Sequence, residues 1–341
     1  MESMFLPFLL IIFASVFQGS FGLGMKYMAP LKWESWWLVH VTIAMIIIPL
    51  VWAFIAVPNL SEVLSTSFSD PTMQGVVFMA MLFGFLWGIG GILFGVSVPY
   101  IGLSLTMGIV MGLAGSVGAL IPLLQMENAT TTPQFPYVIL GLVITLVGVA
   151  ITAKAGIDKD KISADASGEQ SNIVKGISIA VACGVLSALL NVGFVQATPI
   201  AKLAEELGAI DRNASLAAWV VVLFGAYIMN AGYAVFLLFK NKSWNSFSVA
   251  GSSKAYKGAI VASICWFGAL GVYGQGAALI GPIGGVIGWP MLLGLSLIVS
   301  NFWAYRAGEW NNAKKPFNLL LIGLVVLVLA SVVLGYSNTA A

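Results

Sequence analysis

The residues best suited to bind a small solute are uncharged amides and aromatic rings inside long apolar stretches. An amide both donates and accepts hydrogen bonds, as a hydroxyl requires, and an aromatic face suits the apolar side of a sugar ring. The alternative for each amide is a hydrogen bond between helices, since an unpaired buried amide is costly. We select six candidate substrate-binding residues: Gln18, Trp87, Asn191, Trp266, Tyr273 and Gln275. This uncharged set predicts a neutral, hydroxyl-rich ligand.

Three ionisable side chains are candidates for coupling or gating. His40 lies about one turn inside an apolar stretch, and histidine changes its charge near neutral pH. Lys26 and Glu34 flank a short polar connection and are expected to pair as an inner gate, together with Arg306 and Glu309. The alternatives are a structural histidine, ordinary surface charges and a structural loop after Arg306.

The chain carries no recognisable set of catalytic residues. It has one histidine, no acidic residue in the middle of any apolar stretch, and neither a CxxC motif nor a phosphate-binding GxxxxGK[ST] loop. Its two cysteines lie in apolar runs, without metal-ligand spacing. We therefore expect no enzyme activity, no cofactor and no metal. The net charge of +2 gives no indication of nucleic-acid binding.

Composition indicates the elements that position these residues. Of 341 residues, 60% are hydrophobic and 8% are charged, against about 25% charged in soluble domains. An all-α polytopic membrane protein follows, since about 20 apolar residues span a bilayer. Ten spans are expected, at about 4–25, 36–57, 74–97, 101–124, 136–154, 174–197, 216–239, 257–279, 283–304 and 317–336.

One stretch, Leu82 to Leu120, has 39 residues without Asp, Glu, Lys, Arg or His, and is long enough for two of these spans. We expect Val98-Pro99-Tyr100 to separate them, because proline cannot continue the helical hydrogen bonds. Its glycines recur at four-residue spacing, which lets helices approach closely in lipid. The pairs are Gly84/Gly88, Gly91/Gly95 and Gly108/Gly112.

The polar segment between Lys154 and Lys175 divides the spans into five and five. We expect a first five-helix repeat at 1–155, a cytoplasmic connecting loop at 156–173, and a second repeat at 174–341. An odd number of spans per half inverts the second half, an arrangement common in transporters. The connections numbered odd along the chain hold 13 of the 15 basic residues. Because bases collect on the cytoplasmic side, both termini are expected to be extracytoplasmic.

Two short polar segments, 59–70 and 201–212, are expected to lie at the outer membrane surface. The tryptophans near the start of the second span, Trp33, Trp36 and Trp37, suit interfacial anchors, whereas Trp87 is flanked by long apolar runs.

Several motifs recur in order along nearly the whole chain. They are LFGxxWGIG at Leu82 to Gly90 with Tyr100 and Gly102, then Cys183-Gly184 with Ser187, Asn230 with Gly232, Trp266 with Tyr273, and EWNNA at Glu309 to Ala313 followed by two bases and Pro316. In these motifs the sequence resembles the L-rhamnose–proton symporter family of the drug/metabolite transporter superfamily. The final EWNNA segment, in the right order, makes the resemblance specific.

The resemblance implies a five-plus-five helix fold and a secondary transporter of a small neutral sugar, with a deoxyhexose such as L-rhamnose as the best single expectation. It also implies proton coupling in a bacterial inner membrane; it leaves the oligomeric state undetermined. The junction GQGAALIGPIGGVIGW departs from the family's pattern, which has ionisable and aromatic residues there. An uncoupled facilitator or exporter of another metabolite, or a membrane-embedded sensor, therefore stays an alternative.

Overall fold

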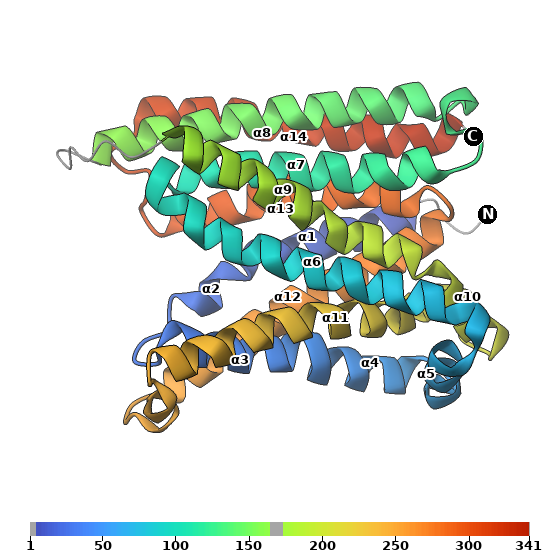
Figure 1. Ribbon diagram of the computed structural model, residues 1–341. Helices are drawn as coiled ribbons and strands as arrows, with labels where there is room; N and C mark the ends of the chain where they lie inside the picture. Colours follow the sequence, from blue (N-terminus) through green and yellow to red (C-terminus); the bar gives the residue numbers. More distant parts are fainter. Residues whose placement is uncertain (1–4, 164–172, 341) are drawn as a thin grey trace. The chain divides into compact units, whose positions relative to one another are not determined.

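The computed structural model describes residues 5–163 and 173–340, which form helices and short connections without any β-strand (Figure 1). Ten helical segments in this part of the chain are long and apolar enough to cross a membrane. They run Phe5–Met25, Trp33–Ala56, Pro71–Ile101, Leu103–Gln125, Phe135–Ile162, Ile173–Glu206, Asp211–Lys240, Ser253–Ile280, Gly284–Arg306 and Lys314–Ser337. The ten expected spans are confirmed, each near its expected position.

The individual helices have the following bounds: α1 Phe5–Ser20, α2 Gly22–Met25, α3 Trp33–Thr42, η1 Ile43–Ile47, α4 Ile48–Ala56, α5 Leu60–Ser69, α6 Pro71–Ile101, α7 Leu103–Gln125, η2 Ala129–Thr131, α8 Phe135–Ser163, α9 Ile173–Gln196, α10 Thr198–Glu206, α11 Asp211–Lys240, η3 Trp244–Ser248, α12 Ser253–Ile280, α13 Gly284–Arg306, α14 Lys314–Ser337 and η4 Asn338–Ala340. In the second span, a π-helical turn, η1, joins α3 to α4 just before Pro49.

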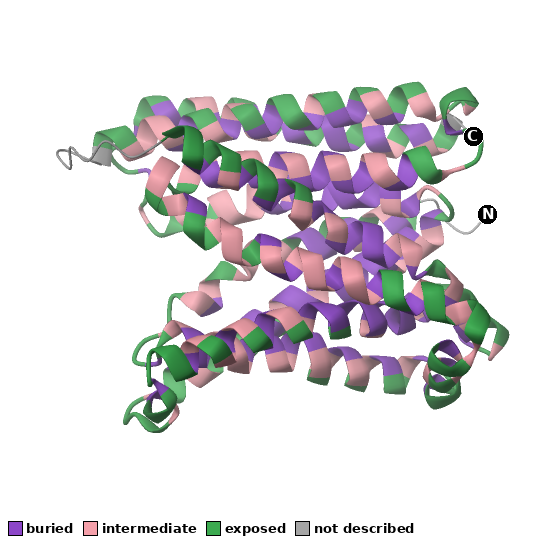
Figure 2. Ribbon diagram, viewed as in Figure 1, coloured by how far each residue is buried: buried purple, intermediate pink, exposed green. Residues whose placement is uncertain are grey.

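Apolar side chains are exposed along continuous stripes of the spanning helices, as lipid contact requires. On α14 the exposed residues recur every three or four positions: Leu321, Ile322, Val325, Val328, Leu329 and Val332. The opposite side, with Leu320, Leu327 and Leu334, is buried (Figure 2). In water such a stripe would expose a large apolar surface, so it indicates a face that contacts lipid.

The expected break at Pro99 is wrong. Helix α6 continues through Pro99 to Ile101, and the backbone turns at Gly102, where φ is +79°. Proline removes one backbone hydrogen bond, a loss that membrane helices tolerate, and the next turn is kept because Gly102 N donates to Val98 O at 2.8 Å. The positive φ is open to glycine and strained for other residues.

The chain forms two compact units, each built from both halves of the sequence. Unit 1 comprises Met1–Gly88 and Val192–Gly281, and unit 2 comprises Ile89–Asn191 and Pro282–Ala341. In unit 1, α12 packs against α1, α3 and α11, and α11 also packs against α3 and α4. In unit 2, α8 lies beside α14 along its length, and α7 packs against α8 and α13 (Figure 1).

Glycines bring helices together within each unit. A Cβ added at Gly84 of α6 would lie 2.1 Å from Val222 O of α11, and one at Gly108 of α7 would lie 2.2 Å from Ala153 Cβ of α8. Real Cβ atoms do not approach other atoms this closely, so these two glycines allow contacts that any larger residue would prevent. The four-residue glycine spacing therefore predicted true packing faces at these two positions.

The expected loop 156–173 is partly helical. Helix α8 extends to Ser163 and α9 begins at Ile173, while 164–172 lie outside the described residues. The two short polar segments are the helices α5 and α10, which pack together in unit 1, where Asn59 Nδ2 donates to Leu207 O at 3.1 Å.

Candidate functional site

Two tryptophans from different helices face each other in unit 1. Trp87 of α6 and Trp266 of α12 have ring centroids 5.5 Å apart and planes tilted by 35°. Trp266 is 7% exposed, whereas Trp87 is only half-buried. Trp87 is positioned by the close packing of α6 on α11. The next residue, Gly88, allows this packing, because a Cβ there would lie only 2.8 Å from Met229 Cβ. The pair presents aromatic surface next to the buried interior of the unit.

His40 of α3 lies in an aromatic cage next to this pair. Its ring is 1% exposed, stacks on Trp36 at 5.4 Å, and meets Trp266 edge-on at 6.4 Å. Phe21 and Trp37 complete the cage, each with its ring centroid 5.2 Å from that of the histidine.

A hydrogen bond joins His40 of α3 to Ser263 of α12, with Nδ1 of the ring 3.0 Å from Ser263 Oγ. The Ser263 hydroxyl also lies within hydrogen-bonding distance of two carbonyl oxygens, Ala259 O at 2.7 Å and His40 O at 3.1 Å. This contact fixes the position of a side chain whose unperturbed pKa is near neutral pH.

An amide outside the expected set belongs to the same cluster. Asn230 of α11 accepts a hydrogen bond from Trp37 Nε1 at 3.2 Å, and its own amide group donates to Ala226 O at 2.9 Å. The recurring motifs include Asn230 and so indicated that it matters, but no feature of the sequence predicted its hydrogen bond with Trp37. The interfacial role expected for Trp36 is wrong, since its side chain is fully buried and donates to Ala255 O. The spacing of Trp36, Trp37 and His40 on one helical face could have indicated this.

Tyr273 and Gln275 of α12 belong to a second group in unit 1. Tyr273 is fully buried against Phe194 and Trp219, whose rings stack with centroids 4.4 Å apart. Trp219 Nε1 is buried without a hydrogen-bond partner in the structure, and Gly274 makes room for it. Gln275 Nε2 donates to Asn213 Oδ1 at 3.1 Å. Trp266 and Tyr273, seven residues apart on α12, thus contact different partners.

Gln18 and Asn191 have contrasting environments. Gln18 of α1 is half-buried, and its side-chain oxygen is buried without a hydrogen-bond partner in the structure. Asn191 of α9 is fully buried in unit 2, and its Nδ2 donates to Gly118 O at 2.8 Å and to Gly285 O at 2.9 Å. These bonds connect α9 to α7 and α13. Asn191 belongs to unit 2, whereas the other five candidate ligands belong to unit 1.

The gate candidates do not form the expected pairs. Glu34 is buried and accepts hydrogen bonds from Asn241 Nδ2 at 3.0 Å and from Ser243 Oγ, which connects α3 to the loop after α11. Lys26 is exposed, and within the described residues it makes no ion pair with Glu34. Glu309 pairs with Lys159 of α8 at 3.6 Å rather than with Arg306.

The amides of unit 1 can therefore bind ligand hydroxyls, and its aromatic rings can bind the apolar face of a ligand. The same unit holds one buried imidazole, that of His40. In residues 5–163 and 173–340, no group of three His, Cys, Asp or Glu side chains could hold a metal ion. Ten helices of the described residues are long and apolar enough to span a membrane. Together with the uncharged interior of unit 1, they define an integral membrane protein of the solute-transporting class.

Comparison with known proteins gives the family. The family of L-rhamnose-proton symport proteins matches residues 4–340, so the chain belongs to this family, whose members are transporters and not enzymes. The chain is 29% identical over 326 residues to the L-rhamnose-proton symporter of Mannheimia succiniciproducens, covering 91% of each chain. The L-rhamnose-proton symporters of Yersinia pestis and Escherichia coli K12 are also 29% identical, over 318 and 313 residues, covering 91% and 89% of each chain.

Proposed function

We propose that the protein imports L-rhamnose together with protons as a secondary transporter. The family match over residues 4–340 carries this proposal, and the similar proteins from three bacterial genera are named L-rhamnose-proton symporters. The interior of unit 1 agrees with a neutral sugar, because its candidate ligands are amides and aromatic rings without a carboxylate or an ammonium group among them.

Transport proceeds by alternating access between two inverted repeats, residues 1–155 and 174–341, joined by the connection 156–173. Five spanning helices in each half support an inverted relationship. The packing within the units supports it as well. The second span packs against the seventh in unit 1, as α3 and α4 against α11, and the fifth packs against the tenth in unit 2, as α8 against α14.

The sugar binds in unit 1 at Trp87 and Trp266, with amide and hydroxyl partners from Gln18, Tyr273 and Gln275 of the same unit. The half-buried face of Trp87 suits the apolar side of the ring, and the side-chain oxygen of Gln18, which lacks a partner, suits a hydroxyl donor. Asn191 holds the backbones of α7 and α13 through its Nδ2 group, so its contribution is to position those helices.

His40 carries the coupled proton. Its ring contacts Trp266 edge-on. Protonation of the imidazole and binding of the sugar at Trp266 therefore take place on adjacent side chains. Glu34 of α3 acts by holding the loop after α11.

The protein lies in the bacterial inner membrane with both termini extracytoplasmic. The basic residues of the odd-numbered connections support this orientation. An epitope tag at the C-terminus should bind antibody without permeabilisation. Labelling that appears only after permeabilisation would refute this orientation.

Uptake of labelled L-rhamnose into proteoliposomes with an imposed pH gradient tests the function. We expect accumulation above the external concentration, which collapses when an uncoupler dissipates the gradient. If labelled sugar only reaches the external concentration and the uncoupler does not change its uptake, the protein is an uncoupled facilitator. Binding without any uptake would establish a membrane-embedded sensor, and neither binding nor uptake of L-rhamnose would exclude this sugar as the substrate.

A further inference from the structure

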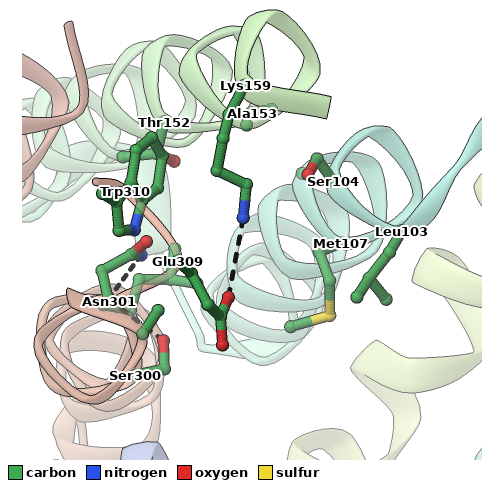
Figure 3. A pocket seen from close by; sticks show the side chains of 14 residues that line it. Leu103, Ser104, Met107, Thr152, Ala153, Lys159, Ser300, Asn301, Glu309 and Trp310 are labelled. Carbon is green, nitrogen blue, oxygen red and sulfur yellow. Dashed lines mark hydrogen bonds and ion pairs between the residues drawn. The ribbon is translucent and has the colours of Figure 1, made fainter. Parts of the chain in front are cut away.

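Unit 2 contains a cavity that none of the six candidate ligands lines. It has a volume of about 190 Å³ and lies where α7 begins, α8 ends and α13 ends, closed on one side by the loop after α13. Pockets for drug-sized ligands start at about 300 Å³, and each water molecule takes about 30 Å³ of the liquid. The cavity therefore has room for a compact solute or a few waters. Figure 3 shows the side chains that line it.

The charges on its wall cancel. Lys159 extends from α8 toward Glu309 of the loop, with 3.6 Å between Nζ and the carboxylate (Figure 3). The two side chains are 18% and 46% exposed. An anion drawn to Lys159 would meet the carboxylate of Glu309, and a cation drawn to Glu309 would meet the ammonium group. A neutral ligand with hydroxyls avoids both penalties, since a hydroxyl can accept from one group and donate to the other.

A buried hydrogen-bond donor without a partner also lines this cavity. Trp310 is 5% exposed, and its Nε1–H has no hydrogen-bond partner in the structure. The Lys159 ammonium lies 4.9 Å from the centre of its ring and holds the indole in place. A buried donor left unpaired costs free energy that a ligand acceptor recovers. This donor is therefore an independent sign that an oxygen-bearing molecule belongs here.

The remaining polar groups complete a ring of donors and acceptors. Asn301 of α13 uses its Nδ2 to donate to Leu297 O at 2.8 Å, which leaves its carbonyl oxygen to accept. Ser300 and Ser104 donate to Leu297 O and to Asp160 Oδ2, at 3.1 and 2.7 Å, so each hydroxyl oxygen can still accept. Leu103 and Met107 of α7 provide the apolar part of the wall.

We infer that this cavity is a second binding site, for a small neutral polyhydroxy molecule. That this molecule is a monosaccharide rests on the proposed function. That it is neutral and carries hydroxyls rests only on the donors and acceptors that line the cavity. The site belongs to unit 2, at the end of α8 that the distribution of basic residues places in the cytoplasm. Its lining residues are all different from the candidate transport ligands of unit 1, and in the proposed orientation it lies on the cytoplasmic side.

The test uses the purified full chain in lipid nanodiscs with Ser300→Cys as a reporter inside the cavity. The rate of N-ethylmaleimide labelling at residue 300 is measured by mass spectrometry of its peptide, so native Cys183 and Cys265 do not interfere. L-rhamnose, L-fucose, D-mannose, glycerol and inorganic phosphate are each added as probes. We expect a monosaccharide to slow labelling at least fivefold and phosphate to leave it unchanged. Ser178→Cys, at an exposed position of α9, is the matched control and should react equally fast with every probe.

Two further variants distinguish this site from the transport site. Trp266→Ala should lose uptake and keep the protection of residue 300, whereas Asn301→Ala should lose the protection. Protection by phosphate alone, or by no neutral probe, would overturn the inference. If wild-type vesicles take up no L-rhamnose, the proposed function fails while protection by the other neutral probes still decides this site.

Should Ser300→Cys fail to fold, the binding stoichiometry of neutral sugars on the unaltered chain replaces it. Equilibrium dialysis with labelled L-rhamnose and labelled D-mannose should give two molecules of the bound sugar per chain for the wild type and one for Glu309→Gln. The same stoichiometry in both proteins, or no binding of either sugar, would overturn the inference.

Discussion

His40 and Trp266 meet edge to face, with ring centroids 6.4 Å apart and planes at 81°. One of these rings comes from α3 and the other from α12, and Trp266 in turn lies against Trp87 of α6. A titratable group and a sugar-compatible aromatic surface are thus neighbours inside unit 1. In the proposed mechanism, a proton on His40 and a sugar at Trp266 would therefore affect each other over the distance between adjacent side chains.

Replacing Trp266 with alanine should abolish transport and preserve insertion. The change removes one of the two rings of the Trp87–Trp266 pair. A tenfold loss in the uptake rate constant corresponds to about 1.4 kcal/mol. We expect at least that loss in initial uptake of L-rhamnose, with Trp266→Phe in between. Trp244→Ala, at an exposed position of η3, is the control and should transport normally. Equal uptake by wild type and Trp266→Ala would contradict the assigned sugar contact.

Replacing His40 with glutamine should uncouple sugar movement from the proton gradient. Glutamine can keep a hydrogen bond to Ser263 but cannot take up the proton. The variant should exchange internal for external labelled sugar and fail to accumulate sugar when a pH gradient is imposed. Ser263→Ala removes only the hydroxyl and should still accumulate sugar, at a lower rate. Accumulation by His40→Gln at the wild-type level would show that the proton is carried elsewhere.

Replacing Gly84 with alanine should destabilise unit 1. The added methyl would lie 2.1 Å from Val222 O, so α6 must move away from α11, and overpacking of this kind typically costs about 1–3 kcal/mol. Gly91→Ala is a matched control on the same helix, since a Cβ there meets nothing within 4 Å. Thermal unfolding in detergent should give a lower midpoint for Gly84→Ala and an unchanged or higher one for Gly91→Ala. Equal midpoints would indicate that α6 and α11 do not pack closely.

Replacing Asp70 with alanine should lower thermal stability at neutral pH and have less effect in acid. The Asp70 carboxylate, just before α6, accepts from the backbone N–H and the hydroxyl of Thr72, both at 2.8 Å. These hydrogen bonds lower the pKa of Asp70 below its ordinary value. The carboxylate therefore stabilises the folded chain above its unfolded-state pKa, and this contribution is lost as pH falls through the folded-state pKa.

The measurement is the unfolding midpoint of wild type and Asp70→Ala across the acid range. Asp70→Asn is the control, because asparagine caps a helix nearly as well and does not titrate. A difference between wild type and Asp70→Ala that stays constant down to the most acid pH would contradict the role of the ionised carboxylate.

Replacing Glu34 with alanine should loosen the loop after α11. Asn241 and Ser243 would lose their acceptor, and leaving the buried hydroxyl of Ser243 unpaired costs about 1–3 kcal/mol. Faster hydrogen exchange is expected at the amides around residues 241–246, read by mass spectrometry. Lys26→Ala, at an exposed side chain, should leave exchange there unchanged. An unchanged exchange rate in Glu34→Ala would mean that the loop is held by other contacts.

Hydropathy predicted the helices well because membrane spans are continuous apolar runs, and lipid demands that property of every span. The break at Pro99 was wrong because proline at that depth loses only one hydrogen bond, while Gly102 three residues later can adopt the positive φ that a turn needs. The π-helical turn at Ile43–Ile47 had no comparable signal, since its residues are ordinary apolar ones.

Contacts between helices were much less predictable than the helices. Residue type selected His40, and residue type together with the recurring motifs selected Trp266. Their contact depends on how α3 and α12 pack, which the spacing within either helix does not encode. Glu309 pairs with Lys159, 150 positions earlier in the chain, rather than with the nearby Arg306. Trp36 is buried because α3 packs against α11 and α12. Its position near the start of a span, among other tryptophans, is instead typical of residues at the membrane interface.

The interleaving of the two sequence halves in both units has a consequence for biogenesis. Unit 1 needs α12, which ends at Ile280, and unit 2 needs α14, near the C-terminus. A ribosome that has translated the first five spans has therefore completed neither unit, and the inserted helices must wait in the bilayer for later partners. Neither unit can therefore complete its packing until most of the chain has been synthesised.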